Sequence, residues 1–318
     1  MSRVVTVGAA QLGPICLADD RPVVVARLIA LLRQAHDRGA RLVVFPELAL
    51  TTFFPRWYMA DQAQVDAYFE TEMPGPETQP LFDEAARLGV GFYLGYAELA
   101  EEGGETHRYN TSILVDERAR IVGKYRKVHL PGSTENRPEL EFQQLEKRYF
   151  EYGNLGFKVF HAFDGIMGMA LCNDRRWPET FRMLGLQGAE MILIGYNSAA
   201  HDPYGGPDAY EQRIFHSNLA AQAGAYQNSS WVVSVAKAGV EDGAGLIGSS
   251  VIVNPSGEIV ARGETLADEL LVWDCDLDDC RPGKELMFNF AKHRRVEHYG
   301  LITQQTGVVV PEPEEPTA

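Results

Sequence analysis

Cysteine is scarce in this chain of 318 residues, which holds only four: Cys16, Cys172, Cys275 and Cys280. No two of them form a C-x-x-C pair, and none has a histidine at zinc-finger spacing. The spacing therefore argues against a disulfide framework and against a cysteine-based zinc site.

Basic residues are also few: the chain has 29 Lys and Arg residues against 44 Asp and Glu residues, which gives a formal net charge of −15. Nucleic acids and anionic membranes bind basic surfaces, so we expect neither as a partner. No apolar run approaches the length of a membrane span, and the N-terminus lacks the apolar segment of a signal peptide. The sequence predicts a cytoplasmic protein, in which a locally positive pocket for an acidic small molecule is still possible.

Internal repeats and low-complexity linkers are absent too, although the length alone would allow two domains. Apolar residues make up 45% of the chain and charged residues 23%, which is typical of a soluble globular protein. We predict a single domain over residues 1–303. Residues 304–318 end in VVVPEPEEPTA, and we expect them to form a flexible C-terminal tail.

Strand and helix patterns alternate along the chain, which predicts the α/β class. The first fifty residues predict a βαβ unit with a parallel pair of strands. The same order recurs around the cysteine at position 172. We expect two strand-rich halves with helices outside, built from strands near 3–11, 41–48, 90–97, 109–115, 121–125, 166–171 and 190–197 and from helices near 21–38, 78–88, 178–186 and 210–226.

The stretch IMGMALCNDRRWPE places Cys172 between an apolar strand and a helix that begins at Pro178. A thiol there faces the positive end of the helix, which predicts a lowered thiol pKa and a nucleophilic thiolate. Arg175 and Arg176 can hold a substrate carboxylate by bidentate hydrogen bonds. The alternative is that Cys172 is an ordinary core residue, since free cysteines are usually buried.

Two further charged residues are expected at strand ends, where sites gather in α/β sheets. Glu47 follows Phe45 and Pro46, and Lys127 follows the second strand of the hairpin. Each could equally be a solvated surface charge, because glutamates and lysines are mostly exposed. His129 and His216 are available as bases, but neither has a distinctive sequence context.

Together, FPELAL, GKYRKVHLP and LCNDRRWPE resemble the three signature segments of the nitrilase superfamily of carbon–nitrogen hydrolases. The resemblance covers nearly the whole chain and implies a four-layer αββα sandwich with a Glu–Lys–Cys triad. It implies that Glu47 is the general base, Lys127 the oxyanion stabiliser and Cys172 the nucleophile. LEKRYFEYGNLGF matches a further segment and adds Glu146 to the catalytic candidates.

ELALTTFFPRW, TEMPGPETQPLF, GFYLGYAEL, CNDRRWPE and AGAYQN are similar to N-carbamoyl-D-amino-acid hydrolases. That similarity implies that Arg175 and Arg176 bind the substrate carboxylate. We also expect Asn173 and Asn197 to orient the ureido group, and we count His129 among the candidate binding residues.

Several positions depart from that branch. Gln144 stands where we expect a histidine before LEK, Ser198-Ala199 follow GYN in place of Thr-Pro, and residues 202–212 differ. These loops are expected to border the pocket, so the chirality and side chain of the substrate stay open. The alternatives are an amidase or carbamoyl-amine hydrolase of the same superfamily and, in a different class, a non-catalytic scaffold.

The resemblance implies hydrolysis of an N-carbamoyl amino acid to the amino acid, carbon dioxide and ammonia. Lys127 and the backbone N–H of Asn173 would stabilise the oxyanion. We expect no metal and no other cofactor, because the lysine supplies the electrophile. We also expect a homodimer or homotetramer, with apolar residues of 281–310 packed on the partner copy.

Overall fold

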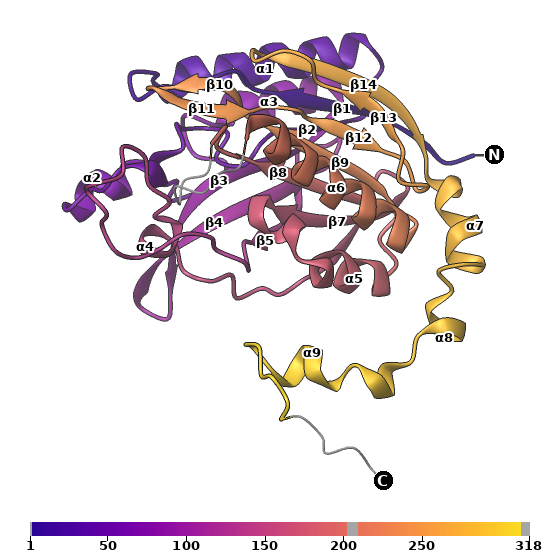
Figure 1. Cartoon of the computed structure of the whole chain (residues 1–318). Coiled ribbons are helices and arrows are strands. Elements are labelled where there is room, and N and C mark those ends of the chain that lie inside the picture. Colours follow the sequence, from indigo (N-terminus) through magenta and orange to yellow (C-terminus); the bar gives the residue numbers. More distant parts are fainter. Residues whose placement is uncertain (1, 202–208, 313–318) are drawn as a thin grey trace.

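The computed structural model describes residues 2–201 and 209–312. Two six-stranded sheets pack face to face, and helices cover the outer face of each sheet (Figure 1). This four-layer αββα sandwich confirms the expected fold class. Residues 202–208 of the divergent loop and 313–318 of the expected tail lie outside the described residues.

The first sheet has the spatial order β14-β1-β2-β3-β4-β5. Strands β1, β2 and β3 are parallel, whereas β14, β4 and β5 pair antiparallel with their neighbours. The bounds are β1 (Val4–Gln11), β2 (Leu42–Val44), β3 (Gly91–Glu102), β4 (Glu105–Val115), β5 (Ile121–Arg126) and β14 (Glu269–Asp276).

The second sheet has the order β13-β12-β9-β8-β7-β6, with β7, β8 and β9 parallel at its centre. Because the carboxyl ends of parallel strands share one edge, Cys172, Asn197 and Lys237 follow adjacent strands at that edge. The bounds are β6 (Val159–Ala162), β7 (Gly165–Leu171), β8 (Met191–Tyr196), β9 (Trp231–Ala236), β12 (Val251–Val253) and β13 (Ile259–Arg262), and β10 (Ala238–Glu241) forms a separate hairpin with β11 (Ala244–Ile247).

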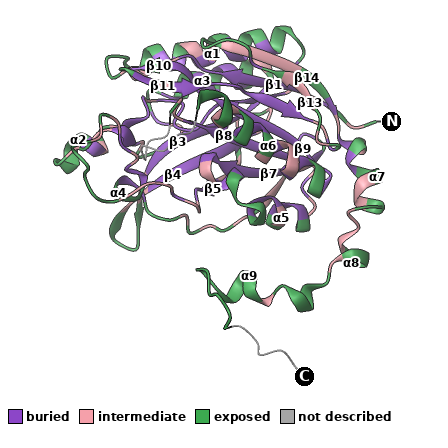
Figure 2. Cartoon of the chain, viewed as in Figure 1, coloured by how far each residue is buried: buried purple, intermediate pink, exposed green. Residues whose placement is uncertain are grey.

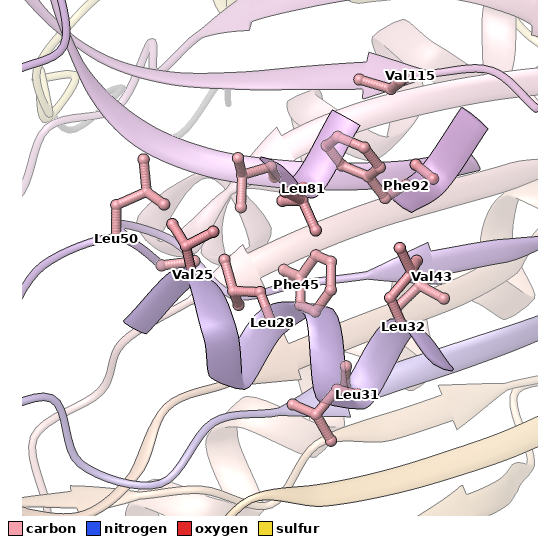
Figure 3. Packing of buried hydrophobic residues seen from close by; sticks show 14 of the residues in the cluster. Val25, Leu28, Leu31, Leu32, Val43, Phe45, Leu50, Leu81, Phe92 and Val115 are labelled. Carbon is pink, nitrogen blue, oxygen red and sulfur yellow. The ribbon is translucent and has the colours of Figure 1, made fainter. Parts of the chain in front are cut away.

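Helices α1 (Arg21–Asp37) and α3 (Gln79–Leu88) cover the first sheet. Figure 3 shows their leucines packed on Val43, Phe45 and Phe92 of the sheet layer. Helices α5 (Pro178–Leu186) and α6 (Tyr210–Asn228) cover the second sheet. No helix among the described residues is long and apolar enough to cross a bilayer.

The central strands carry apolar side chains on both faces, and these side chains hold the layers of the sandwich together. In β7, Met167, Met169 and Leu171 point between the two sheets, while Ala170 points outward to α5 and α6. Successive strand side chains alternate between faces, so a strand with apolar residues at both sets of positions is buried on both sides. Figure 2 shows this burial along the central strands of both sheets.

Short elements make up the connections and the C-terminal segment. Residues 280–312, here called the C-terminal arm, begin at the buried Cys280, contact α5 and α6 through Phe290 and Phe288, and are otherwise largely exposed (Figures 1 and 2). The short elements are η1 (Phe54–Arg56), α2 (Gln62–Asp66), α4 (Glu146–Tyr149), η2 (Cys172–Arg176), η3 (Leu277–Asp279), α7 (Cys280–Glu285), α8 (Phe290–His293), η4 (Val296–His298) and α9 (Gly300–Gln304).

Two glycines allow the segment after β2 to lie between the sheets. A Cβ atom on Gly95 of β3 would lie 2.7 Å from Glu47 Cα, and one on Gly195 of β8 would lie 2.5 Å from Glu47 N. Both separations are shorter than carbon atoms tolerate, so any larger residue would displace this backbone. Glycine at these two strand positions therefore determines where Glu47 can sit.

Candidate active site

Cys172 lies at the junction of β7 and the 3₁₀ turn η2, with a backbone φ of 44°. This left-handed conformation is uncommon for a residue with a side chain, and such strain gathers at functional sites. Asp174 holds the turn, because its carboxylate accepts hydrogen bonds from Leu171 N at 3.0 Å and from the Tyr125 hydroxyl at 2.7 Å. The buried Sγ then lies 3.2 Å from the carbonyl oxygen of Asn197.

Glu47, Lys127 and Glu146 form a buried ion cluster beside this thiol. Lys127 Nζ lies 2.7 Å from Glu47 Oε1 and 2.5 Å from Glu146 Oε2, and all three residues are at most 1% exposed. Asn110 Nδ2 donates to Glu47 Oε1 at 2.8 Å and lies 3.5 Å from Glu146 Oε2. The four predicted catalytic residues are therefore brought to one place by β2, β5, α4 and β7.

The backbone of Asn197 connects the ion cluster to the thiol. Its N–H donates to Glu47 Oε2 at 3.0 Å, and its carbonyl accepts from Cys172 Sγ at 3.2 Å. Its side-chain Nδ2 also donates to the Glu47 carbonyl at 3.0 Å. One residue thus contacts both Glu47 and Cys172.

Burial and the neighbouring charges together set the pKa values of this cluster. Burial raises the pKa of Glu146 to about 7, because Glu47 adds to the effect of burial and Lys127 only partly offsets it. For Lys127, burial lowers the pKa, but Cys172, Glu146 and Glu47 outweigh burial and hold it well above its ordinary value. Lys127 is therefore a permanent cation at neutral pH.

The expected lowering of the Cys172 pKa is wrong. Burial and the Glu47 carboxylate raise the pKa of the thiol to about 11, although Lys127 and Arg175 act in the opposite direction. The sequence suggested a thiol facing a helix terminus, whereas η2 separates Cys172 from α5 and the thiol is buried beside a carboxylate. The resting nucleophile is a thiol that must give up its proton as it attacks.

A cavity of about 650 Å³ opens above the thiol. Cys172 and Asn197 contribute to its lining, whereas the carboxylates and the lysine lie beneath them. None of the described lining residues is acidic, and four are basic or titratable to a cation: Arg175, Arg176, Arg213 and His216. The other lining residues are Pro131, Gln144, Pro178, Phe181, Ser198, Ala199, Leu219, Ala220, Ala223, Gly224 and Gln227.

The two adjacent arginines are placed differently. Arg175 is 1% exposed, and its Nη1 donates to the Cys172 carbonyl at 2.6 Å. Its Nη2 donates to the hydroxyls of Ser198 at 2.9 Å and Ser217 at 3.2 Å, so its guanidinium braces the turn. Arg176 is exposed at the edge of the cavity, where its Nη1 lies 3.4 Å from Asn173 Oδ1.

His129 and Asn173, two further candidate binding residues, are not among the residues that line the cavity. His129 Nδ1 lies 2.8 Å from Asp174 Oδ1, and its ring stacks on Trp177 at 5.2 Å. Asn173 Nδ2 donates to the His129 carbonyl at 3.1 Å. Both side chains hold the wall of the turn, and their contact with a substrate stays a prediction.

Sequence reasoning missed Asn110, which bonds both carboxylates. The sequence carries no distinct signal for it, because β4 (ETHRYNTSILV) is polar over most of its length, and only the pairing with Lys127, whose N–H donates to the Asn110 carbonyl at 2.8 Å, shows its place. Sequence reasoning also missed Arg213, which follows the divergent residues 202–212, whereas Ser198 belongs to a loop that was expected to border the pocket and does line the cavity. Within the described part of the chain, no three His, Cys, Asp or Glu residues gather as metal ligands do.

A family model described as Carbon-nitrogen hydrolase matches residues 6–285. This chain belongs to the nitrilase superfamily of carbon–nitrogen hydrolases. Relatives of this hydrolase include N-carbamoylputrescine amidase of Arabidopsis thaliana, 30% identical over 91% of this chain and 93% of that protein. A nitrilase of Pyrococcus abyssi is 31% identical over 93% of this chain and 99% of its own length. The crystal structure of a carbon–nitrogen hydrolase from Helicobacter pylori superposes with a TM-score of 0.81 at 21% identity, covering 96% of this chain and 99% of that chain, so the fold is shared.

Glu146→Gln tests the raised pKa of the second glutamate. Glu146 ionises only as the pH rises through about 7, so the kcat/KM of the hydrolase should fall as the pH drops through that value. Glutamine keeps an acceptor for Lys127 but cannot titrate, so we expect this acid limb to vanish and kcat to fall by about 10². The measurement is a pH profile of kcat/KM. The exposed Glu211→Gln variant is the control, and an unchanged limb in Glu146→Gln would contradict the assignment.

Proposed function

We propose that this hydrolase cleaves the carbamoyl group from N-carbamoyl amino acids, releasing the amino acid, carbon dioxide and ammonia. The observation that carries the proposal is the cavity above Cys172, whose described lining has three arginines and no carboxylate. Such a lining favours a substrate with a carboxylate. The similarity of the sequence segments around Arg175 and Arg176 to N-carbamoyl-D-amino-acid hydrolases favours the D series.

The geometry supports a two-step reaction. Glu47 takes the thiol proton as Cys172 Sγ attacks the ureido carbon, which explains how a thiol of raised pKa can act. The negative oxygen of the tetrahedral intermediate is stabilised by the Lys127 ammonium. Glu47 returns the proton to the departing nitrogen, and the intermediate collapses to a carbamoyl-type thioester. Glu47 then deprotonates a water molecule that hydrolyses this thioester and passes the proton to the Cys172 sulfur. The released carbamic acid decomposes to carbon dioxide and the second amine.

A carbamoyl amine is the second candidate substrate, because relatives of the chain are named N-carbamoylputrescine amidases. That substrate shares the carbamoyl group but carries a cationic amine in place of a carboxylate. Arg175, Arg176 and Arg213 would repel an ammonium in the cavity, so the lining favours the carboxylate.

Ammonia release across a matched panel tests the substrate class. The panel pairs D- and L-N-carbamoyl amino acids with N-carbamoylputrescine and simple amides. We expect turnover of the carbamoyl amino acids, faster for the D series, and none by Cys172→Ala, which lacks the nucleophile. Faster turnover of N-carbamoylputrescine than of every carbamoyl amino acid would reverse the choice, and retained turnover by Cys172→Ala would refute the mechanism.

Alanine variants of Arg175 and Arg176 test which of the two arginines binds the substrate carboxylate. Arg176 is the exposed cavity residue, so Arg176→Ala should lower kcat/KM for a carbamoyl amino acid by roughly 10–200-fold, the equivalent of one charged hydrogen bond. The carboxamide analogue should be much less affected. Arg175→Ala should slow both substrates alike, because it loosens the Cys172 turn. If the ratio of kcat/KM for the carbamoyl amino acid to kcat/KM for its carboxamide is unchanged in Arg176→Ala, Arg176 does not bind the carboxylate.

We further propose that the hydrolase assembles with a second copy of itself through α5, α6 and the C-terminal arm. The arm packs lightly on the body, with Phe288 against Tyr226 at 5.0 Å and Arg182 over Phe290 at 4.3 Å. Beyond these contacts, large apolar side chains are 42–70% exposed on all three segments: Met183, Leu186, Leu219, Tyr226, Leu286, Met287, Val296, Leu301 and Ile302. An apolar surface of this extent is typical of an interface.

Light scattering at micromolar concentration tests the assembly. We expect the mass of a dimer or tetramer for the wild type. Replacing Leu301 and Ile302 together by Glu should shift the mass toward the monomer, because charges would be buried in the interface. Leu17→Glu, at an apolar residue 52% exposed outside these segments, is the matched control. A monomeric wild type would refute the assembly.

A further inference from the structure

Gln144 joins the cavity to the buried ion cluster. It lines the cavity above Cys172 and is half-buried, two residues before the start of α4. Its Nε2 donates to Glu146 Oε1 at 2.8 Å. Glu146 itself is completely buried, so Gln144 gives the cavity a direct hydrogen-bonded link to that carboxyl group.

The backbone around Gln144 is firmly held. Its carbonyl accepts from Ser133 N at 2.9 Å, and Leu145 N donates to the Pro55 carbonyl at 2.9 Å. Gly132 has a φ of 83°, and a Cβ atom there would lie 2.0 Å from the Gln144 carbonyl oxygen, so only glycine permits this crossing. Rotation of the terminal amide is consequently the simplest movement open to Gln144.

The hydrogen bonds of Glu146 dictate where it can accept a proton. Its Oε2 already faces two donors, Lys127 Nζ at 2.5 Å and Asn110 Nδ2 at 3.5 Å. A proton taken up by Glu146 must therefore lie on Oε1 of Glu146, where it faces the N–H of Gln144. Two donors facing each other repel, and the conflict is removed when the amide turns and presents Oε1 of Gln144 to the carboxylic acid.

The charges that surround Glu146 place this event near neutral pH. Lys127 after β5 favours the ionised form, whereas burial and Glu47 after β2 favour the protonated form more strongly. Cys172 after β7 also interacts with Glu146 and is a neutral thiol over most of the range. Burial, with Glu47, raises the pKa of Glu146 to about 7.

We propose that Gln144 is a proton-dependent specificity residue, whose amide oxygen faces the bound carbamoyl group only while Glu146 is ionised. In that state Nε2 of Gln144 donates to Glu146, and Oε1 of Gln144 accepts a hydrogen bond from an N–H of the substrate. When Glu146 takes up a proton, the turned amide presents its NH₂ to the same substrate N–H, and the contact becomes repulsive. This inference rests on the proposed carbamoyl substrate, and it makes substrate binding weaken as the pH falls.

Steady-state kinetics of wild type and Gln144→Met between about pH 6 and pH 9 test the proposal. The wild-type KM should rise roughly 2–10-fold as the pH falls through the titration of Glu146, the size of one neutral hydrogen bond. Gln144→Met has no amide, so its KM should be raised at high pH and should no longer depend on Glu146. Gln227→Met, at another glutamine of the cavity lining, is the matched control and should keep the wild-type pH dependence of KM.

An infrared titration gives a second readout that does not need turnover. The carbonyl band of the protonated Glu146 carboxyl is identified by its loss in Glu146→Gln. Its midpoint should rise by roughly 0.5–1 pH unit in Gln144→Met, because the hydrogen bond lost from the ionised carboxylate is charge-assisted and stronger than the one lost from the protonated acid. An unchanged midpoint, or a wild-type KM dependence in Gln144→Met, overturns the proposal. If no carbamoyl amino acid is hydrolysed, the proposed function fails, and the midpoint still decides whether Gln144 is coupled to Glu146.

Discussion

The ion cluster of one lysine between two glutamates is the interaction on which the site depends. Removing three charges from water is costly, and the cost is recovered only when the geometry is good and the remaining polar atoms are bonded. Asn110, Asn197 and Gln144 supply those bonds to the carboxylates. The cluster therefore requires a rigid surrounding structure, and it holds a cation, Lys127, beside two glutamates and the Cys172 thiol.

The αββα sandwich meets this demand because both sheets place strand ends at one edge. β2 and β5 of the first sheet lead to Glu47 and Lys127, and β7 and β8 of the second lead to Cys172 and Asn197. Gly95 and Gly195 let the Glu47 backbone approach strands of both sheets. The chemistry thus lies between the two layers, in surroundings dry enough to raise the pKa of Cys172 and Glu146.

Motifs made of short contiguous segments could be read from the sequence, whereas properties set by distant neighbours could not. The fold and the gathering of Glu47, Lys127, Glu146 and Cys172 follow from local strand patterns and family-like segments. The thiol pKa was misjudged because burial and Glu47, more than a hundred residues away in the chain, outweigh the opposing effects of Lys127 and Arg175. Asn110 escaped notice for the same reason, since only the pairing of β4 and β5 brings it to Lys127.

The different positions of Arg175 and Arg176 follow from the 3₁₀ form of η2. Side chains three residues apart eclipse in such a turn, so Arg175 lies over Cys172 and Arg176 lies over Asn173. A regular α-helix would have rotated these pairs apart. Arg175, the inner arginine, is thereby hydrogen-bonded within the turn that carries Cys172, while Arg176, the outer one, lies at the edge of the cavity. Substrate preference can change at the outer position and in the neighbouring loop without disturbing the inner arginine or the ion cluster.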